Sequence, residues 1–517
     1  MRLTTVVSLV LALGSTSFCL VAQDAPLFSL REKQGPNAVG FKVIEQYDFS
    51  RTFQPLIDDL GKPYQGERAR PLQTLVWYPS LKSSSKPMTV GDYVALKTTE
   101  TNFGKPQMPV GLEEWLTGGM KPTFAKSLWA IRDAVPAAGR FPVVIYAPSF
   151  SSISWENADL CEYLASYGYV VIASPGMGVT TESTHDVAGT NAQAQDISFL
   201  IGYAHSLPNV NMSAIAVVGF SWGGLSNLFA AARDNRIDAL VALDGSLRYF
   251  PGVVKQAGDV HPDQMTIPLL FFKGQTSLEG QAQLESNFHS EGPNVLNEWT
   301  HGDLISVQML GLVHPEFSSM AHRNEKLWQY EFAGLQEADY GREDGVIGYA
   351  WVARYVREFL DGYLKQNDPS MRFLKNTPSE NGVPQHVLAV SFRAGKSLPA
   401  SFTSFRTEVG RQGFHHVADV YATTQKQQPD FKLGADTVVT WAYELLADKH
   451  LPEAIDVMKL GIQLDPSSRV YSSLGEMYMK SGQKQAAIES YKTALEKDSN
   501  NPIAKQSLAE LQGAATK

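Results

Sequence analysis

Between residues 143 and 310, short apolar stretches alternate with longer segments of helical pattern, and this alternation restricts the possible folds more than any other feature. The apolar stretches are residues 143–148, 169–173, 215–220, 237–243, 268–272 and 304–310. They are nearly continuously apolar, which is typical of strands that are covered on both faces. Helical segments are expected between them at 157–167, where Gly168 marks the end, and at 192–207. The sequence therefore predicts an α/β fold class, with a mostly parallel sheet and helices on both faces.

Gly219, Ser221 and Gly223 form a G-x-S-x-G pattern at the end of the strand-like stretch 215–220. The pattern alone is common by chance, so its context decides its meaning. An unbroken helical pattern follows at 225–232, as expected of a nucleophile elbow, in which a strand turns sharply into a helix and exposes the serine hydroxyl. Glycine is needed where the chain passes close to itself. We therefore predict that Ser221 is a nucleophile.

The flanking segments complete the predicted hydrolase domain, which we place at residues 24–366. Residues 41–45 and 72–79 indicate two antiparallel strands that open the sheet. Residues 80–140 are less regular and include Trp115, and they are consistent either with a flap over a pocket or with ordinary surface packing. The domain closes with a long helix whose apolar stripe comprises Val352, Tyr355, Val356, Phe359, Leu360 and Tyr363.

From about residue 433 a repeated pattern replaces the strand–helix alternation. Trp441-Ala442 and Ala454 recur 33 residues later as Leu474-Gly475 and Ala487. Small residues at these positions let paired helices approach, and the spacing resembles that of tetratricopeptide repeats, whose period is about 34. We predict such repeats at 433–517, with a capping helix at 502–511. Residues 367–432 are assigned to a connector, within which 402–425 is a candidate degenerate helix pair.

The N-terminus has one early charge, Arg2, and then an apolar core up to about Gly14, followed by small and polar residues and an expected cleavage site after Ala22 or Gln23. This is typical of a secretory signal peptide at residues 1–23, and an uncleaved anchor is the alternative, although the core is shorter than the ~20 residues of a membrane span. A secreted or periplasmic protein with no stable membrane span is expected. After cleavage Cys161 is the remaining cysteine of the 2 in the chain, so no intramolecular disulfide is predicted.

The charge and motif content exclude several functional classes. The net charge of -9 and the lack of a basic stripe argue against nucleic-acid binding. Gly176 and Gly178 lack the third glycine of a dinucleotide fingerprint, and His415 and His416 form an isolated pair without metal-ligand spacing. We therefore expect neither a metal nor a cofactor.

A serine nucleophile needs a base and an acid that orients the base, in the chain order Ser, acid, His in this fold. Asp244 follows the stretch 237–243 and is the first candidate for the acid, with Glu279 as the alternative. His314 follows the stretch 304–310, where the last strand would deliver a base, and the alternatives are His301 and His322. The predicted triad is Ser221, His314 and Asp244.

The segments around these residues resemble those of platelet-activating factor acetylhydrolases and dienelactone hydrolase-like esterases. The resemblance rests on Gly219-Phe220-Ser221-Trp222-Gly223-Gly224, Ala242-Leu243-Asp244 and Leu312-Val313-His314-Pro315-Glu316-Phe317. It implies an α/β-hydrolase fold over roughly residues 35–365 and favours Asp244 over Glu279. It also implies an oxyanion hole formed by the backbone amides of Trp222 and Phe150. In the loop that carries the second of these amides, relatives usually have His-Gly-x-Gly, whereas this chain has Pro148-Ser149-Phe150-Ser151.

These features predict an exported serine hydrolase that cleaves carboxylic esters through an acyl-enzyme. An amidase or peptidase of the same fold is the first alternative, because both reactions use the same triad. A non-catalytic scaffold that acts through its repeats is the second. The resemblance implies a small ester or lipid-like substrate, and the repeats suggest a protein partner.

Overall fold

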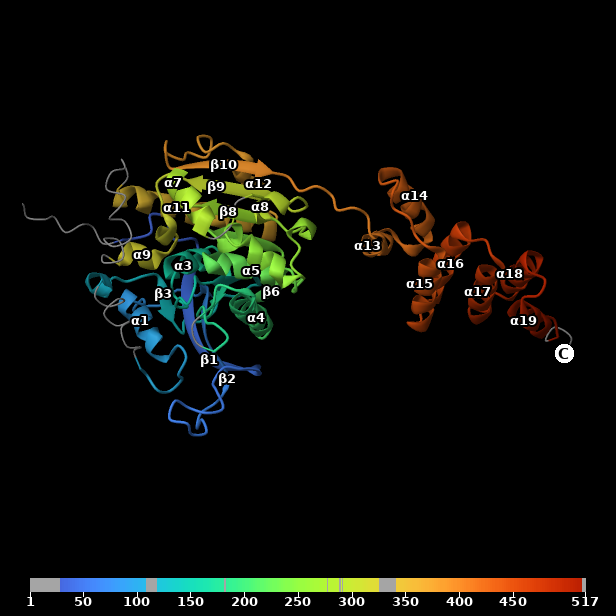
Figure 1. The fold of residues 1–517 in the computed structure, drawn as a ribbon, viewed down its shortest axis with the longest axis horizontal. Coiled ribbons are helices and arrows are strands. Elements are labelled where there is room, and N and C mark those ends of the chain that lie inside the picture. Colours follow the sequence, from blue (N-terminus) through green and yellow to red (C-terminus); the bar gives the residue numbers. More distant parts are fainter. Residues whose placement is uncertain are drawn as a thin grey trace, which may run out of the picture. The chain divides into compact units, whose positions relative to one another are not determined.

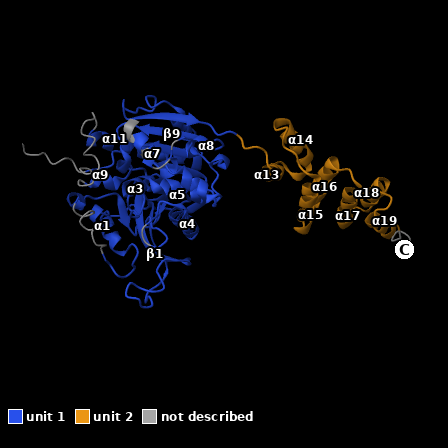
Figure 2. Cartoon of the chain, in the orientation of Figure 1, with its two compact units in different colours: residues 1–396 blue, residues 397–517 orange. Residues whose placement is uncertain are grey.

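The computed structural model describes residues 28–107, 119–180, 183–276, 278–287, 290, 292–324 and 341–513. It divides into two compact units, Met1–Lys396 and Ser397–Lys517 (Figure 2). The predicted signal peptide at 1–23 lies outside the described residues, as does Trp115 of the 80–140 stretch, for which either a flap or surface packing was expected.

The first unit is built on a sheet that has 10 strands in the described part of the chain, in the order β10-β9-β8-β7-β6-β4-β5-β2-β1-β3 (Figure 1). The strands are β1 (Ala38–Thr52), β2 (Ala69–Ser80), β3 (Ala130–Arg132), β4 (Phe141–Ala147), β5 (Val170–Ala173), β6 (Val210–Phe220), β7 (Ala239–Leu243), β8 (Leu269–Lys273), β9 (Leu304–Met309) and β10 (Leu388–Arg393). Strands β5, β4, β6, β7, β8 and β9 run parallel, whereas β1 and β2 pair antiparallel with Lys42 opposite Val76. The predicted mostly parallel sheet with an antiparallel opening is confirmed.

Helices cover both faces of this sheet. The helices of the first unit are α1 (Val90–Ala95), α3 (Ala158–Ser166), α4 (Val187–Ala204), α5 (Trp222–Ala231), α6 (Pro251–Ala257), α7 (Leu278–Asn287), α8 (Val295–Glu298), α9 (Ser319–Arg323), α11 (Arg342–Leu364) and α12 (Asp368–Lys375). Alternate residues of each strand point to opposite faces. One apolar cluster joins residues of the strands to α3 and α11, and a second joins the intervening strand residues to α4 and α5.

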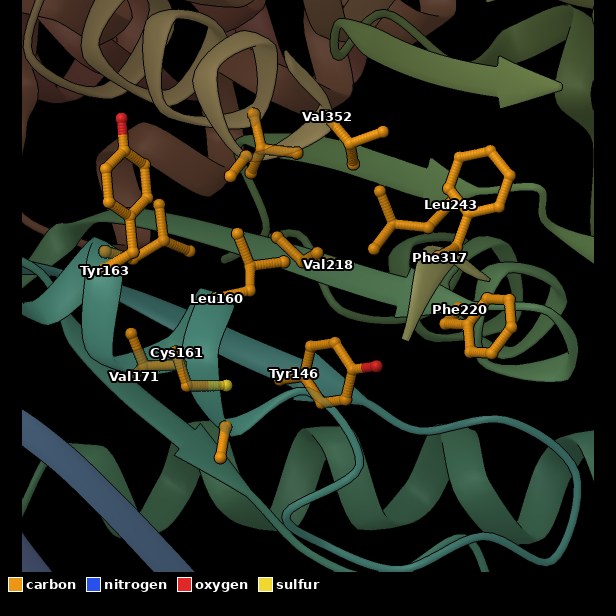
Figure 3. Close-up of a cluster of buried hydrophobic side chains, with 14 of the residues drawn as sticks. Tyr146, Leu160, Cys161, Tyr163, Val171, Val218, Phe220, Leu243, Phe317 and Val352 are labelled. Atoms are coloured by element: carbon orange, nitrogen blue, oxygen red, sulfur yellow. The ribbon is translucent and has the colours of Figure 1, made fainter. Parts of the chain in front are cut away.

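In the first of these clusters, side chains of β6 and β7 pack against α11. Figure 3 shows Val218 of β6 and Leu243 of β7 beside Val352 of the long helix α11, with Leu160 of α3 nearby. All four side chains are buried, and burial of each aliphatic side chain contributes about 1.5–3 kcal/mol. The predicted apolar stripe of α11 is confirmed. Cys161 is a buried free thiol in the same cluster.

The first unit extends beyond residue 366, where the sequence placed the end of the hydrolase domain. Helix α12 packs Leu374 into the core, with Met371 against Gly362 of α11. Strand β10 then adds to the edge of the sheet antiparallel to β9, with Ser391 opposite Ser306. The unit therefore ends at Lys396. The sequence placed the boundary too early because β10 is a partly polar edge strand, and its residue pattern resembles that of a connector.

The second unit consists of helices throughout its described part. They are α13 (Phe402–Gln412), α14 (Val417–Gln427), α15 (Ala435–Ala447), α16 (Leu451–Leu464), α17 (Ser468–Lys480), α18 (Lys484–Lys497) and α19 (Pro502–Gly513). A Cβ on Gly475 would lie 2.8 Å from the Tyr491 ring, so the small residue lets α17 approach α18. The candidate helix pair at 402–425 is present as α13 and α14, and the candidate cap at 502–511 as α19.

Among the described residues, no helix has the length and apolar character needed to cross a membrane.

Candidate active site

Ser221 lies on a sharp turn between β6 and α5. Its backbone has φ of 52° and ψ of -116°, a strained conformation for a residue with a side chain. The surrounding glycines are required by close approach, because a Cβ on Gly219 would lie 2.4 Å from the Gly223 carbonyl, and a Cβ on Gly223 would lie 2.1 Å from the Ala147 oxygen. The predicted strand, turn and helix are present. Trp222 is the first residue of α5, where backbone amides lack an intrahelical acceptor.

Ser221, His314 and Asp244 form a continuous line of hydrogen-bonding groups. The Nε2 atom of His314 is 3.0 Å from Ser221 Oγ, and the Nδ1 atom is 2.7 Å from Asp244 Oδ2. Asp244 directly follows β7, and the amide of Gly274, which follows β8, donates to its other oxygen at 3.1 Å. A carboxylate acceptor at Nδ1 favours the tautomer that leaves Nε2 free to accept the serine proton.

The alternative bases do not reach the serine. His301 Nδ1 lies 2.8 Å from the Lys396 carbonyl oxygen. His322 is fully buried, with Nε2 2.8 Å from the Glu316 carbonyl oxygen and its ring stacked on Phe28. Burial lowers the pKa of His322 to about 4. The alternative acid, Glu279, falls within α7, and its side chain lies outside the described residues.

A pocket of about 390 Å³ opens beside Ser221 and His314. Much of its wall is apolar and comes from Phe150, Ile153, Phe220, Pro315, Met320 and Ala321. Lys97 adds a cation to the lining, and its ammonium is paired with the buried carboxylate of Glu100. The pocket therefore accommodates a compact, mainly apolar group next to the serine hydroxyl.

Phe150 lies on the turn that follows β4, and this turn forms one wall of the pocket. Its ring stacks on His185 with centroids 3.9 Å apart and meets Trp222 edge-on at 5.9 Å. The side chains of the two residues predicted to supply oxyanion amides are therefore packed together. Burial lowers the pKa of His185, whose ring also meets that of Trp222 with centroids 5.0 Å apart.

Two buried polar residues near the site were missed from the sequence, Glu156 and Gln193. Glu156 accepts hydrogen bonds from the Ser149 amide at 2.9 Å and from the Ser152 hydroxyl at 2.6 Å. Gln193 of α4 donates to the Pro148 carbonyl at 2.8 Å. The available signal was weak, because a polar residue in a turn, such as Glu156, or in a helical segment, such as Gln193, is ordinarily exposed.

In the described part of the chain, no group of three or more His, Cys, Asp or Glu side chains is placed to hold a metal ion. A parallel sheet whose loops after β6, β7 and β9 bring together a serine on an elbow, an aspartate and a histidine has the α/β-hydrolase fold.

Comparison with known proteins agrees with this class. Residues 130–291 match the Dienelactone hydrolase family, and residues 468–501 match the Tetratricopeptide repeat family. The predicted resemblances to dienelactone hydrolase-like esterases and to tetratricopeptide repeats are thereby confirmed at these residues. The resemblance to platelet-activating factor acetylhydrolases stays a prediction.

Individual relatives match shorter stretches. A putative carboxymethylenebutenolidase of Synechocystis sp. is 31% identical over 103 residues, which are 17% of this chain and 42% of the relative. An uncharacterized protein of Pseudomonas aeruginosa is 29% identical over 163 residues, which are 28% of this chain and 44% of the relative. The chain thus spans less than half the length of these curated relatives. Among solved structures, a ferulic acid esterase from Streptomyces cinnamoneus has a TM-score of 0.49 and 21% identity, covering 70% of this chain and 98% of the esterase.

Proposed function

We propose that this protein is a serine hydrolase that cleaves carboxylic esters. The observation that carries the proposal is the hydrogen-bonded line from Ser221 Oγ through the His314 imidazole to the Asp244 carboxylate, with separations of 3.0 Å and 2.7 Å. Such a line activates a hydroxyl that is otherwise a poor nucleophile. The match of residues 130–291 to the Dienelactone hydrolase family supports the same chemistry.

In the proposed reaction, Ser221 Oγ attacks the ester carbonyl carbon while His314 Nε2 takes the hydroxyl proton. Asp244 stabilises the imidazolium that forms, and it holds the ring in position. The backbone amides of Trp222 and Phe150 donate to the oxyanion. His314 then returns the proton to the leaving alcohol. Water attacks the acyl-serine in the same way, so that one ester and one water give one acid and one alcohol.

The lining of the pocket supports a compact ester whose acyl or alcohol part is apolar. A volume of about 390 Å³ with Phe150, Ile153 and Met320 in its wall suits a short aliphatic chain or an aromatic ring and binds it mainly by burial of apolar surface. A small ester is therefore the proposed substrate class, with lipid-like esters of short acyl chain within it.

Export and a protein partner complete the proposal. The charged start and apolar core of residues 1–23 support secretion or delivery to the periplasm. The match of residues 468–501 to a tetratricopeptide repeat supports binding of a protein by the second unit.

The test is activity profiling of the full chain with a fluorophosphonate probe and with p-nitrophenyl esters of graded acyl length. Labelling of the wild type, its loss in Ser221→Ala, and a preference for short esters are expected. A matching panel of peptides and anilides separates an esterase from an amidase. A folded wild-type protein that neither reacts with the probe nor turns over any ester or amide would overturn the proposal in favour of a non-catalytic role.

A further inference from the structure

The turn after β4, residues 148–152, contains serines where the related esterases carry glycines, so something other than glycine must set its conformation. In the structure the turn is held by the carboxylate of Glu156, which comes a few residues later. Its Oε2 accepts from the Ser149 amide at 2.9 Å and from the Tyr146 hydroxyl at 3.1 Å. Its Oε1 accepts from the Ser152 hydroxyl at 2.6 Å and from the Ser149 hydroxyl. The donors thus flank Phe150 on both sides.

The carboxylate of Glu156 is only 2% exposed, yet the residue contributes to the wall of the pocket. A buried carboxylate is costly unless donors surround it. Burial raises the pKa of Glu156, and the hydrogen bonds from Ser149 and Ser152 oppose that rise. Since all of these donors come from β4 and from the 148–152 turn on either side of Phe150, the carboxylate acts on the shape of that turn.

The backbone at Glu156 also contacts the segment that follows His314. The Glu156 carbonyl accepts from the Ser318 hydroxyl at 2.9 Å and from the Met320 amide at 3.2 Å. Asn157, the next residue, donates to the Phe317 carbonyl at 2.8 Å. One short segment therefore connects the turn of the predicted oxyanion amide with the segment of the predicted base.

We propose that Glu156 is a positioning residue whose carboxylate fixes the 148–152 turn so that the Phe150 amide points to the oxyanion, in place of the glycines of related loops. The inference rests on the proposed esterase function and deepens it, because it assigns the second oxyanion donor. Glu156 acts through the turn and does not touch the reacting atoms.

The experiment compares Glu156→Ala with Glu156→Gln in the full chain on one p-nitrophenyl ester. An oxyanion donor acts in the transition state, so Glu156→Ala lowers kcat by about 10- to 100-fold, less than the ~10²–10³-fold cost of removing a donor outright, while KM changes by less than about threefold. Glu156→Gln restores most of kcat. Its amide oxygen still accepts from Ser149 N–H and Tyr146, and its NH₂ group donates to the hydroxyls of Ser149 and Ser152.

Glu162 provides the matched control, because it is an equally buried carboxylate on the same segment, in α3. It accepts from the Tyr93 hydroxyl at 2.7 Å and from the Ala130 amide at 3.1 Å, away from the pocket lining. Glu162→Ala lowers Tm but leaves kcat of the folded protein within about twofold of wild type. A merely structural role for Glu156 would make its alanine variant behave in the same way.

A trifluoromethyl ketone provides a second readout, because its adduct with Ser221 carries an oxyanion. Its inhibition constant rises in Glu156→Ala in proportion to the loss of kcat/KM. If Glu156→Ala does not fold, Ser152→Ala replaces it. This variant removes one of the donors to the carboxylate and leaves the others in place, so a smaller loss of kcat, about three- to tenfold, is expected.

Three results would overturn the inference: kcat within about threefold of wild type in folded Glu156→Ala, equal losses in the glutamine and alanine variants, or an unchanged inhibition constant. Failure of the proposed function is seen separately. If Ser221→Ala retains full activity, the esterase proposal fails. If Ser221→Ala is inactive but Glu156→Ala keeps the kcat of the wild type, the esterase proposal stands and the positioning role of Glu156 is refuted.

Discussion

Replacing Asp244 by asparagine tests the proposed triad most directly, because the structure determines how the new side chain must lie. One carboxylate oxygen of Asp244 faces His314 Nδ1 at 2.7 Å, and the other accepts from the Gly274 amide at 3.1 Å. The asparagine oxygen can serve only one of these donors. If the NH₂ group faced Gly274, two N–H groups would meet in a buried position, so the oxygen stays with Gly274.

The NH₂ group of the asparagine then points at His314 Nδ1 and forces this nitrogen to accept. The imidazole proton moves to Nε2, which faces Ser221 Oγ at 3.0 Å and can no longer take the serine proton. The loss expected for the wrong tautomer is about 10³- to 10⁴-fold in kcat, or about 4–5.5 kcal/mol of transition-state stabilisation. KM changes little, because Asp244 is 5% exposed and lies behind the imidazole.

The assay measures kcat and KM of Asp244→Asn on the best p-nitrophenyl ester, with a denaturant melt to show that the protein is folded. Glu279→Gln is the control, since Glu279 is the other candidate for the acid, and it is expected to keep wild-type kcat. A folded Asp244→Asn protein that retained more than about a tenth of wild-type kcat, or a Glu279→Gln protein that lost activity to the same extent, would refute the assignment of the acid.

Gly223→Ala places a Cβ 2.1 Å from the Ala147 oxygen, so it should lower the free energy of unfolding by about 2–3 kcal/mol and reduce kcat. The control Gly202→Ala, in an open position of α4, should stabilise by about 0.5–1 kcal/mol in the same melt. His322 has its pKa lowered from 6.5 to about 4, so the unfolded chain binds more protons in this range, and about 3 kcal/mol of stability is lost as the pH falls from 6.5 to 4. His322→Phe should flatten that slope in pH-dependent melts, and an unchanged slope would contradict the assignment. A chain ending at Lys396 keeps the whole first unit, so its turnover of a small ester should stay within about twofold of the full chain.

The strands and the proximity of Ser221, Asp244 and His314 were predictable because both follow from simple rules about where residues must lie. Strands covered on both faces need apolar residues throughout, so the stretches at 215–220 and 237–243 were read correctly as β6 and β7. The carboxyl ends of parallel strands share one edge of the sheet, which brings Ser221, Asp244 and His314 together. The three side chains lie together because of this shared edge, and the number of residues between them along the chain does not determine it.

The domain boundary was not predictable by the same rules. Strand β10 has an alternating pattern of partly buried and exposed residues, and it joins the sheet through backbone hydrogen bonds to β9 that leave no side-chain signature. A polar edge strand looks like a linker until its partner is known. The repeats were easier to identify, because a small residue recurs after 33 residues, as Ala442 and Gly475, and Gly475 faces the large side chain of Tyr491.

The polar residues that hold the site together were missed for a related reason. Gln193 donates to the Pro148 carbonyl at 2.8 Å and accepts from the Ser226 hydroxyl at 2.7 Å, so it ties the turn after β4 to the helix after Ser221. Glu156 ties the same turn to the segment after His314. A polar residue in a helix or in the turn before one is interpreted as solvent-facing unless its partners are known, and these partners lie on other segments. Since Ser221, Asp244 and His314 come from separate loops, their relative positions depend on such cross-links as well as on the strands. The residues that sequence patterns predict least are therefore those expected to set the geometry of the site most closely.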